Sequence, residues 1–209
     1  KLMANSKEIN SNFLKKILKK SFLYFGYEVK RKNNFIDRYH DYIAELTKEE
    51  SKEIEKFEEI CLVSKLNLWS ILQSIKYISY NKIPGDIVEC GIYNGNTLSL
   101  LGKLINKYNL DKKIWGYDTF EQGFLKDSLS EFDMDVKNKK VTLENDNTRY
   151  FTVSEVISNI NQQDAFDPNK YFLIKGDIIK TLDDKKNIPN KISFLRMDTD
   201  IYPTTKKQL

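Results

Sequence analysis

The spacing of apolar residues changes along the chain and divides it into a helical first part and an alternating second part. Thr47 followed by Glu50 forms a capping box, which predicts a helix over about 48–62. Apolar residues three and four positions apart predict a second helix over about 66–80, and a Pro-Gly pair at 84–85 ends it. Two helices are therefore predicted between residues 47 and 84.

Beyond residue 85, short apolar runs alternate with longer amphipathic stretches. The runs are rich in β-branched and aromatic residues, as strands are: Asp86–Ile92, Lys113–Tyr117, Tyr171–Ile174 and Ile192–Met197. Helices are predicted between them at about 97–108 and 153–160, the second after a Thr152–Glu155 capping box. This alternation predicts an α/β fold with a doubly wound, mostly parallel, Rossmann-like sheet. Because only four strands are visible, we expect the sheet to be incomplete at its C-terminal side.

Residues 1–46 are predicted to form a basic helical arm outside a domain of residues 47–209. Ten Lys and Arg stand against three acids in positions 1–40, a net charge of +7 in a chain whose total is +4. Apolar residues in 13–24 share one helical face, with lysines largely opposite. We expect this helix to dock on the domain or on a second copy in a homo-oligomer. Peripheral contact with an anionic membrane is an alternative, and no nucleic-acid partner is expected.

Composition excludes several classes of protein. With 209 residues, 40% of them hydrophobic and 31% charged, the chain can bury a globular core. No apolar run approaches the roughly 18 residues of a membrane span. Cys61 and Cys90 match neither a disulfide framework nor a zinc motif, which favours a cytoplasmic location. Because His40 is the single histidine, a general base has to be a carboxylate, Tyr or Lys.

The residues that follow each predicted strand are polar, and ligands of such sheets bind at this edge. The first strand leads through Glu89 to Gly91 and Gly95, without the G-x-G-x-x-G or G-K-[ST] signatures of phosphate sites. Asp118 follows 23 residues after Gly95, close to the ~20-residue offset of an acid that binds ribose hydroxyls. Acids also follow the third and fourth strands: Asp177, Asp198 and Asp200. A ribosylated cation such as S-adenosylmethionine suits this pattern, with or without a divalent metal.

Four blocks of sequence, in this order, resemble the macrocin O-methyltransferase family. They are Pro-Gly-Asp-Ile-Val-Glu-Cys-Gly (84–91), Trp-Gly-Tyr-Asp-Thr-Phe-Glu-Gln-Gly (115–123), Lys-Gly-Asp (175–177) with Thr181-Leu182, and Phe-Leu-Arg-Met-Asp-Thr-Asp-Ile-Tyr-Pro-Thr-Thr (194–205). The resemblance covers about residues 54–209 and implies a class I methyltransferase fold. It also implies a metal-dependent enzyme that uses S-adenosylmethionine to methylate sugar hydroxyls. The family continues to an Asp-Asp pair that completes its metal site, so we expect this chain to be a C-terminally truncated piece.

The resemblance also implies roles for single residues. Those around the cofactor, from its methionine end through its ribose to its adenine side, are Glu89, Gly91, Tyr93, Gly95, Thr97, Asp118, Thr119, Phe120 and Asp177. Asp198 would bind Mg²⁺ and Asp200 would act as general base while an acceptor hydroxyl attacks the sulfonium methyl. The acceptor lid is expected within 122–150. Its sequence does not identify the sugar, which we expect to belong to a glycan or a glycosylated metabolite.

Other interpretations stay open at this point. A non-catalytic binding or scaffold module of the same fold would transfer no methyl group. A nicotinamide-dependent oxidoreductase is disfavoured by the missing glycine signature. Methylation of a catechol-type phenol would require an aromatic acceptor pocket. Asp200 also has a structural alternative, as the N-cap of a helix that begins near Pro203.

Overall fold

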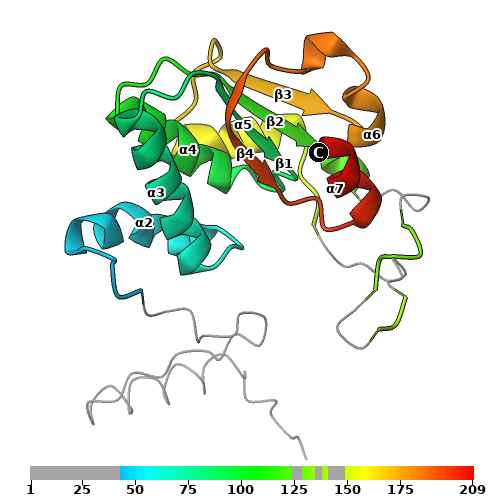
Figure 1. The fold of residues 1–209 in the computed structure, drawn as a ribbon, viewed down its shortest axis with the longest axis horizontal. Coiled ribbons are helices and arrows are strands. Elements are labelled where there is room, and N and C mark those ends of the chain that lie inside the picture. Colours follow the sequence, from blue (N-terminus) through cyan, green and yellow to red (C-terminus); the bar gives the residue numbers. More distant parts are fainter. Residues whose placement is uncertain (1–42, 124–128, 135–137, 141–148) are drawn as a thin grey trace, which may run out of the picture. The chain divides into compact units, whose positions relative to one another are not determined.

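The four apolar runs form the predicted parallel sheet. The computed structural model describes residues 43–123, 129–134, 138–140 and 149–209. The strands are β1 (Asp86–Cys90), β2 (Ile114–Asp118), β3 (Tyr171–Lys175) and β4 (Ile192–Met197), in the order β3-β2-β1-β4. The chain runs outward from β1 to β3 and then returns to the other side of β1, so the topological switch point lies between β1 and β4 (Figure 1). The doubly wound α/β fold is thereby confirmed.

Helices connect the strands, with bounds close to those predicted. The α-helices are α2 (Lys48–Ile60), α3 (Lys65–Tyr80), α4 (Asn96–Lys107), α5 (Val153–Gln162), α6 (Ile178–Thr181) and α7 (Tyr202–Gln208). Two 3-10 turns are η2 (Phe120–Gln122) and η4 (Lys185–Asn187). Both predicted capping boxes form, at Thr47 with Glu50 and at Thr152 with Glu155, and they set the starts of α2 and α5.

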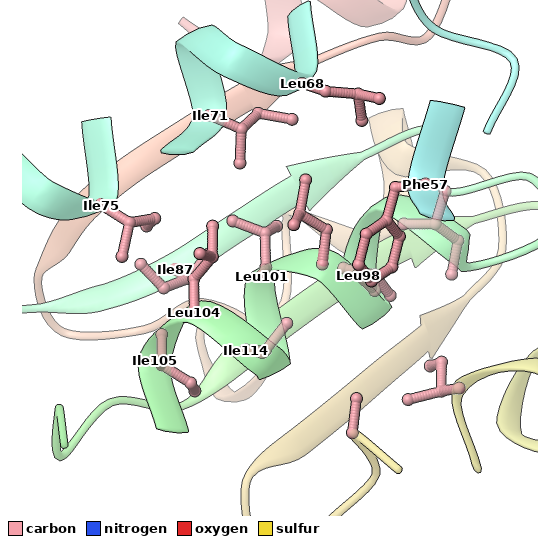
Figure 2. Packing of buried hydrophobic residues seen from close by; sticks show 14 of the residues in the cluster. Phe57, Leu68, Ile71, Ile75, Ile87, Leu98, Leu101, Leu104, Ile105 and Ile114 are labelled. Atoms are coloured by element: carbon pink, nitrogen blue, oxygen red, sulfur yellow. The ribbon is translucent and has the colours of Figure 1, made fainter. Parts of the chain in front are cut away.

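Alternation along the strands gives each face of the sheet its own core. Ile87 and Ile114 lie in the cluster that α2, α3, α4 and α5 complete, shown in Figure 2. Val88 and Trp115 belong to the opposite face, where they pack with Ile178 of α6. Removing a large side chain from such a core costs about 2–5 kcal/mol. The two layers therefore hold the carboxyl ends of the strands in fixed positions.

Several predictions concern residues that the structure does not describe. The arm of residues 1–46 is described only from residue 43, so its helix, its contacts and its boundary stay predictions. The lid segment 122–150 is described only in part. Within the described ranges, no helix is both long and apolar enough to cross a membrane. In the same ranges β4 is one edge of the sheet, and the expectation of further strands from a longer protein stays a prediction.

Candidate active site

Three carboxylates meet at the carboxyl ends of β1, β2 and β4. In the parallel register, Glu89 of β1 lies between Gly116 of β2 and Arg196 of β4. Side chains two residues apart on a strand share a face, so Asp118 and Asp198 follow on the same side of the sheet as Glu89. The charges of Asp118 and Asp198 both act on the Glu89 carboxyl. The cluster stands at the switch point, where open α/β sheets bind their ligands.

Glu89 is completely buried, and only one of its two carboxylate oxygens has a hydrogen-bond partner among the described residues. Its Oε1 accepts a hydrogen bond from Arg196 Nη1 at 2.6 Å. Its Oε2 is also buried and has no hydrogen-bond partner among the residues that the structure describes. Burial raises the pKa of Glu89 to about 7, which the Arg196 charge opposes and the charges of Asp198 and Asp118 reinforce. An unpaired buried acceptor costs about 1–3 kcal/mol, so this oxygen suits a ligand that brings an N–H donor.

Asp118 fixes the loops that follow β1 and β2. Its Oδ2 accepts the backbone N–H groups of Ile92 and Tyr93 at 2.8 and 3.0 Å, and its Oδ1 accepts that of Phe120 at 2.7 Å. Tyr93 and Phe120 both have left-handed backbones, with φ of 50° and 55°, a conformation that persists in non-glycine residues only where the surroundings enforce it. The Phe120 side chain is buried in the main core. Asp118 therefore organises the loops on which the other predicted cofactor residues lie.

Gly91 and Gly95 are both required by close packing. Gly91 has φ +81°, and a Cβ there would lie 2.1 Å from the backbone oxygen of Asp198. Gly95 has φ +79°, and its Cβ would lie 2.7 Å from Val156 Cγ1 of α5. A side chain at either position would therefore collide with the segment that follows β4 or with α5. Their assignment to the methionine end of the cofactor stays a prediction.

Asp198 and Asp200 follow the end of β4 and interact. Asp198 Oδ2 accepts a hydrogen bond from Arg196 Nη2 at 2.6 Å. Asp200 has φ +62°, so the chain turns sharply there. Desolvation and the Asp198 charge raise the pKa of Asp200, and the Arg196 charge opposes the rise. A carboxylate with a raised pKa is a better proton acceptor than an ordinary aspartate.

The described residues do not form a complete metal site. Within the described ranges, no three His, Cys, Asp or Glu side chains come together to hold a metal ion. Mg²⁺ commonly binds through one or two carboxylates and keeps several water molecules. Asp198 could supply one carboxylate to a hydrated Mg²⁺ of that kind. The Asp-Asp pair that completes the family's metal site stays a prediction.

Helix α7 is capped from the lid segment and not by Asp200. The cap position is Ile201, which provides no side-chain hydrogen bond. Instead, Asp133 Oδ1 accepts the N–H of Tyr202 at 2.6 Å. The ring of Phe132 lies 4.8 Å from that of Tyr202, and both rings are exposed. The structural alternative for Asp200 is therefore wrong, and residues 129–134 contact α7 next to it.

The remaining predicted cofactor residues lie on the segments that follow β1, β2 and β3. Tyr93 is half-buried, with its ring edge-on to Phe151 at 5.0 Å. Thr97 is buried in the first turn of α4, and Thr119 directly follows β2. Asp177 caps α6, because its side chain accepts the N–H of Ile179 at 3.0 Å. The structure thus gathers the predicted residues of β1, β2 and β4 at one edge, while Asp177 has a structural contact of its own beyond β3.

Sequence reasoning missed two residues of this region. Arg196 joins Glu89 to Asp198, and its position two residues before Asp198 on a strand was the available signal. Cys61 lies in the linker between α2 and α3. Burial raises the pKa of Cys61 to about 12, and the Glu89 charge contributes to this rise. A hydrogen bond from Thr97 opposes the rise. The linker therefore borders the Glu89 end of the site.

The fold defined by this sheet and its helices is that of methyltransferases. The structure resembles that of the O-methyltransferase NovP, with a TM-score of 0.52 and 22% identity, over 68% of this chain and 57% of that one. It also resembles CalS11, a calicheamicin methyltransferase, with a TM-score of 0.51 and 18% identity, over 78% of this chain and 72% of that one. At these identities the similarity concerns the fold.

The chain itself belongs to the macrocin O-methyltransferase family. The profile of that family, Macrocin-O-methyltransferase (TylF), matches residues 11–209. A relative from Streptomyces niveus, demethyldecarbamoylnovobiocin O-methyltransferase, is 30% identical over 142 residues, which are 66% of this chain and 51% of the relative. The chain thus spans about half the length of that relative. The resemblance inferred from the four sequence blocks is confirmed.

Proposed function

We propose that this chain carries the cofactor site of an S-adenosylmethionine-dependent O-methyltransferase that methylates a sugar hydroxyl. One observation carries the proposal. Glu89 Oε2 lies buried at the switch point without a partner among the described residues. The methionine end of the cofactor has an ammonium group, which supplies both an N–H donor and a positive charge. Family membership supports the same choice of ligand.

The charge of the site also favours a cationic cofactor. In the described part of the chain, the Arg196 guanidinium bonds Glu89 and Asp198, while the Asp118 charge acts on Glu89 and the Asp198 charge acts on both Glu89 and Asp200. Full ionisation would leave three negative charges uncompensated. S-adenosylmethionine, with a sulfonium and an ammonium against one carboxylate, offsets part of this excess, and a divalent cation would offset the rest. A pyrophosphate-bearing nicotinamide cofactor would add negative charge instead, so the oxidoreductase alternative is disfavoured.

The other cofactor contacts follow the family pattern. Gly91, Tyr93, Gly95 and Thr97 would border the methionine end. Asp118 would bind a ribose hydroxyl, because a carboxylate has about four acceptor positions and three backbone N–H groups occupy part of them. Thr119 and Phe120 would shape the ribose pocket through the turn after β2, and Asp177 would lie on the adenine side.

The reaction is an in-line displacement in which a new O–CH₃ bond forms as the S–CH₃ bond breaks. When bound, S-adenosylmethionine supplies the electrophilic methyl group. Asp200 takes the proton of the attacking hydroxyl, and its raised pKa favours this role. Asp198 would hold Mg²⁺, which lowers the pKa of a hydroxyl that it binds. From its buried position, Glu89 would hold the ammonium group at the methionine end of the cofactor.

We propose that the acceptor is a sugar of a glycan or a glycosylated metabolite. The exposed rings of Phe132 and Tyr202 lie beside Asp200 and offer an apolar surface for one face of a sugar ring. A cytoplasmic location, a homo-oligomer, membrane contact of the N-terminal arm and the absence of a nucleic-acid partner remain proposals drawn from the sequence.

Calorimetric titration of S-adenosylhomocysteine tests the cofactor assignment. We expect micromolar binding by the wild-type chain and at least a tenfold loss of affinity in Glu89→Gln. The matched control is Glu53→Gln, outside the site, which removes a partly exposed glutamate that is paired with Lys107 and also has one buried oxygen without a partner among the described residues. Binding of a nicotinamide cofactor in place of S-adenosylhomocysteine, or equal affinity in Glu89→Gln, would contradict the proposal.

A further inference from the structure

We propose that Arg196 couples the cofactor pocket to the catalytic aspartates, so that the charge of Asp198 sets the affinity for the cofactor through one shared guanidinium. This inference rests on the proposed function, because it takes the methionine ammonium as the ligand of Glu89. Arg196 is a positioning residue in this account, since it acts through the two carboxylates that it holds.

The geometry of the sheet creates the bridge. Arg196 and Glu89 are direct partners in the register of β4 and β1. Nη1 donates to Glu89 Oε1 and Nη2 donates to Asp198 Oδ2, both at 2.6 Å. The planar guanidinium provides two parallel donors that a lysine ammonium cannot reproduce in the same places. One side chain therefore spans the boundary between the two sites.

The three side chains differ in their contact with water. Glu89 is 1% exposed, Arg196 14% and Asp198 46%. A charge pair that is removed from water interacts more strongly than an exposed one. The bridge thus runs from the buried carboxylate that we assign to the cofactor to the half-exposed carboxylate that we assign to the metal and the acceptor.

Sharing one positive charge between two carboxylates leaves Glu89 only partly neutralised. If Asp198 loses its charge, the guanidinium acts on Glu89 alone, and Glu89 attracts the cofactor ammonium less strongly. Asp198→Asn should therefore weaken cofactor binding although Asp198 has no role at the methionine end. A direct electrostatic effect of Asp198 on the cofactor would weaken binding as well, but it would not depend on Arg196.

A double-mutant cycle separates these two explanations. The probe is S-adenosylhomocysteine, titrated by calorimetry in the presence of a chelator, so that no metal contributes. We expect Asp198→Asn to lower the affinity at least fivefold in the wild-type background and less than twofold in the Arg196→Lys background. Asp183→Asn is the matched control for loss of an aspartate charge, because Asp183 pairs with Lys207 and not with Arg196, and the affinity of this variant should change less than twofold.

The thermal midpoint of each variant shows whether it is folded. If Arg196→Lys does not fold, Arg196→Gln replaces it with the same expectation. An equal effect of Asp198→Asn in both backgrounds would overturn the coupling and leave the proposed function intact. Failure of the wild-type chain to bind S-adenosylhomocysteine would overturn the proposed function and the coupling together.

Discussion

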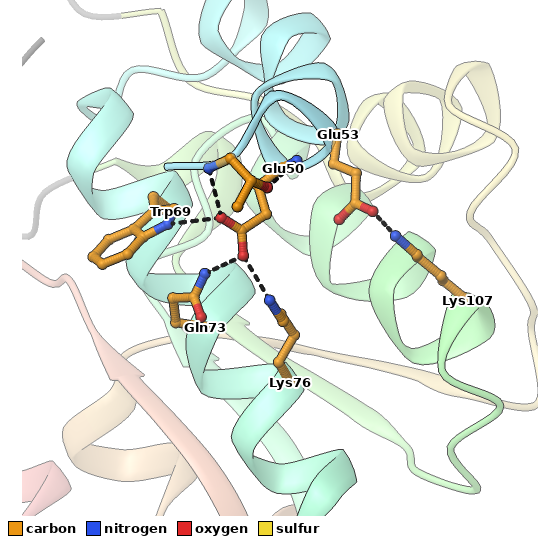
Figure 3. A network of polar contacts seen from close by, with 7 residues as sticks. Glu50, Glu53, Trp69, Gln73, Lys76 and Lys107 are labelled. Atoms are coloured by element: carbon orange, nitrogen blue, oxygen red, sulfur yellow. Dashed lines mark hydrogen bonds and ion pairs between the residues drawn. The ribbon is translucent and has the colours of Figure 1, made fainter. Parts of the chain in front are cut away.

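Glu50 and Glu89 are both buried glutamates, but their hydrogen bonding differs. In Figure 3 the Glu50 carboxylate lies between α2 and α3 and receives donors on both oxygens. These donors are the backbone N–H of Thr47, the indole of Trp69, the amide of Gln73 and the ammonium of Lys76. Glu89 has a guanidinium on one oxygen and, among the described residues, no donor on the other.

The pKa values of the two carboxylates consequently shift in opposite directions. Burial by itself would raise the pKa of Glu50, but the hydrogen bonds from Lys76, Gln73 and Thr47 lower it to about 2. For Glu89 burial prevails over Arg196, and its pKa rises to about 7. A carboxylate with a complete set of donors stabilises the fold and joins two helices. The fully buried Glu89 carboxylate has one oxygen left over at the switch point, and this difference supports the proposal that Glu89 binds the cofactor.

The largest expected difference between the two glutamates is in their contribution to the free energy of unfolding. Glu50→Ala should lower the free energy of unfolding by about 3 kcal/mol, because it leaves the Lys76 charge and the Trp69 and Gln73 donors without their acceptor. Glu89→Gln should not lower it near pH 7 and should raise it by up to about 3 kcal/mol, since the neutral amide avoids the cost of burying a carboxyl whose pKa rises to about 7 on folding. Urea unfolding measures both. Equal losses in the two variants would remove the distinction between them.

The next contrast is the pH dependence of stability. Since the pKa of Glu50 falls from 4.5 to about 2 on folding, its contribution is present above pH 4.5 and is lost as the pH falls toward 2. Since the pKa of Glu89 rises from 4.5 to about 7, its contribution is present below pH 4.5 and is lost as the pH rises through 7. Each effect is on the order of 3 kcal/mol.

Unfolding curves at a series of pH values test these signs. Glu50→Gln should flatten the loss of stability on the acidic side, and Glu89→Gln should flatten the loss between pH 4.5 and 7. If both substitutions flattened the same side, the contrast between the two glutamates would be wrong.

The smallest effect on stability is expected when only one of the donors to Glu50 is removed. Trp69→Phe removes the indole N–H that lies 3.4 Å from Glu50 Oε2, while the Thr47 N–H still donates to that oxygen. We expect a loss of about 0.5–1 kcal/mol in the free energy of unfolding. Urea unfolding against the wild-type chain measures it, and a loss as large as that of Glu50→Ala would mean that the donors do not share the carboxylate.

Local patterns in the sequence predicted the helices and strands, but they did not predict the contacts between residues that are distant in the sequence. The capping box predicted the start of α2 at Thr47, but not that the same Glu50 would meet Gln73 and Lys76 of α3. Arg196 escaped prediction because its partnership with Glu89 depends on β4 pairing with β1, two strands that are distant in the sequence. Such pairing is a property of the assembled sheet.

Asp118 also shows which part of the site could be predicted from the sequence and which part could not. Its spacing from the glycines predicted an acid near a ribose, and the structure does put it at the carboxyl end of β2. Its three backbone N–H donors depend on left-handed conformations at Tyr93 and Phe120. Neither residue type favours that conformation, so no propensity in the sequence could have revealed the loop.

The most direct test of the central claim compares S-adenosylhomocysteine with its analogue that lacks the amino group. The account predicts that the wild-type chain binds the amino form at least tenfold more tightly, and that Glu89→Gln binds the two forms within twofold of each other. A preference for the amino form that persists unchanged in Glu89→Gln would contradict the assignment of the buried Glu89 carboxylate to the cofactor.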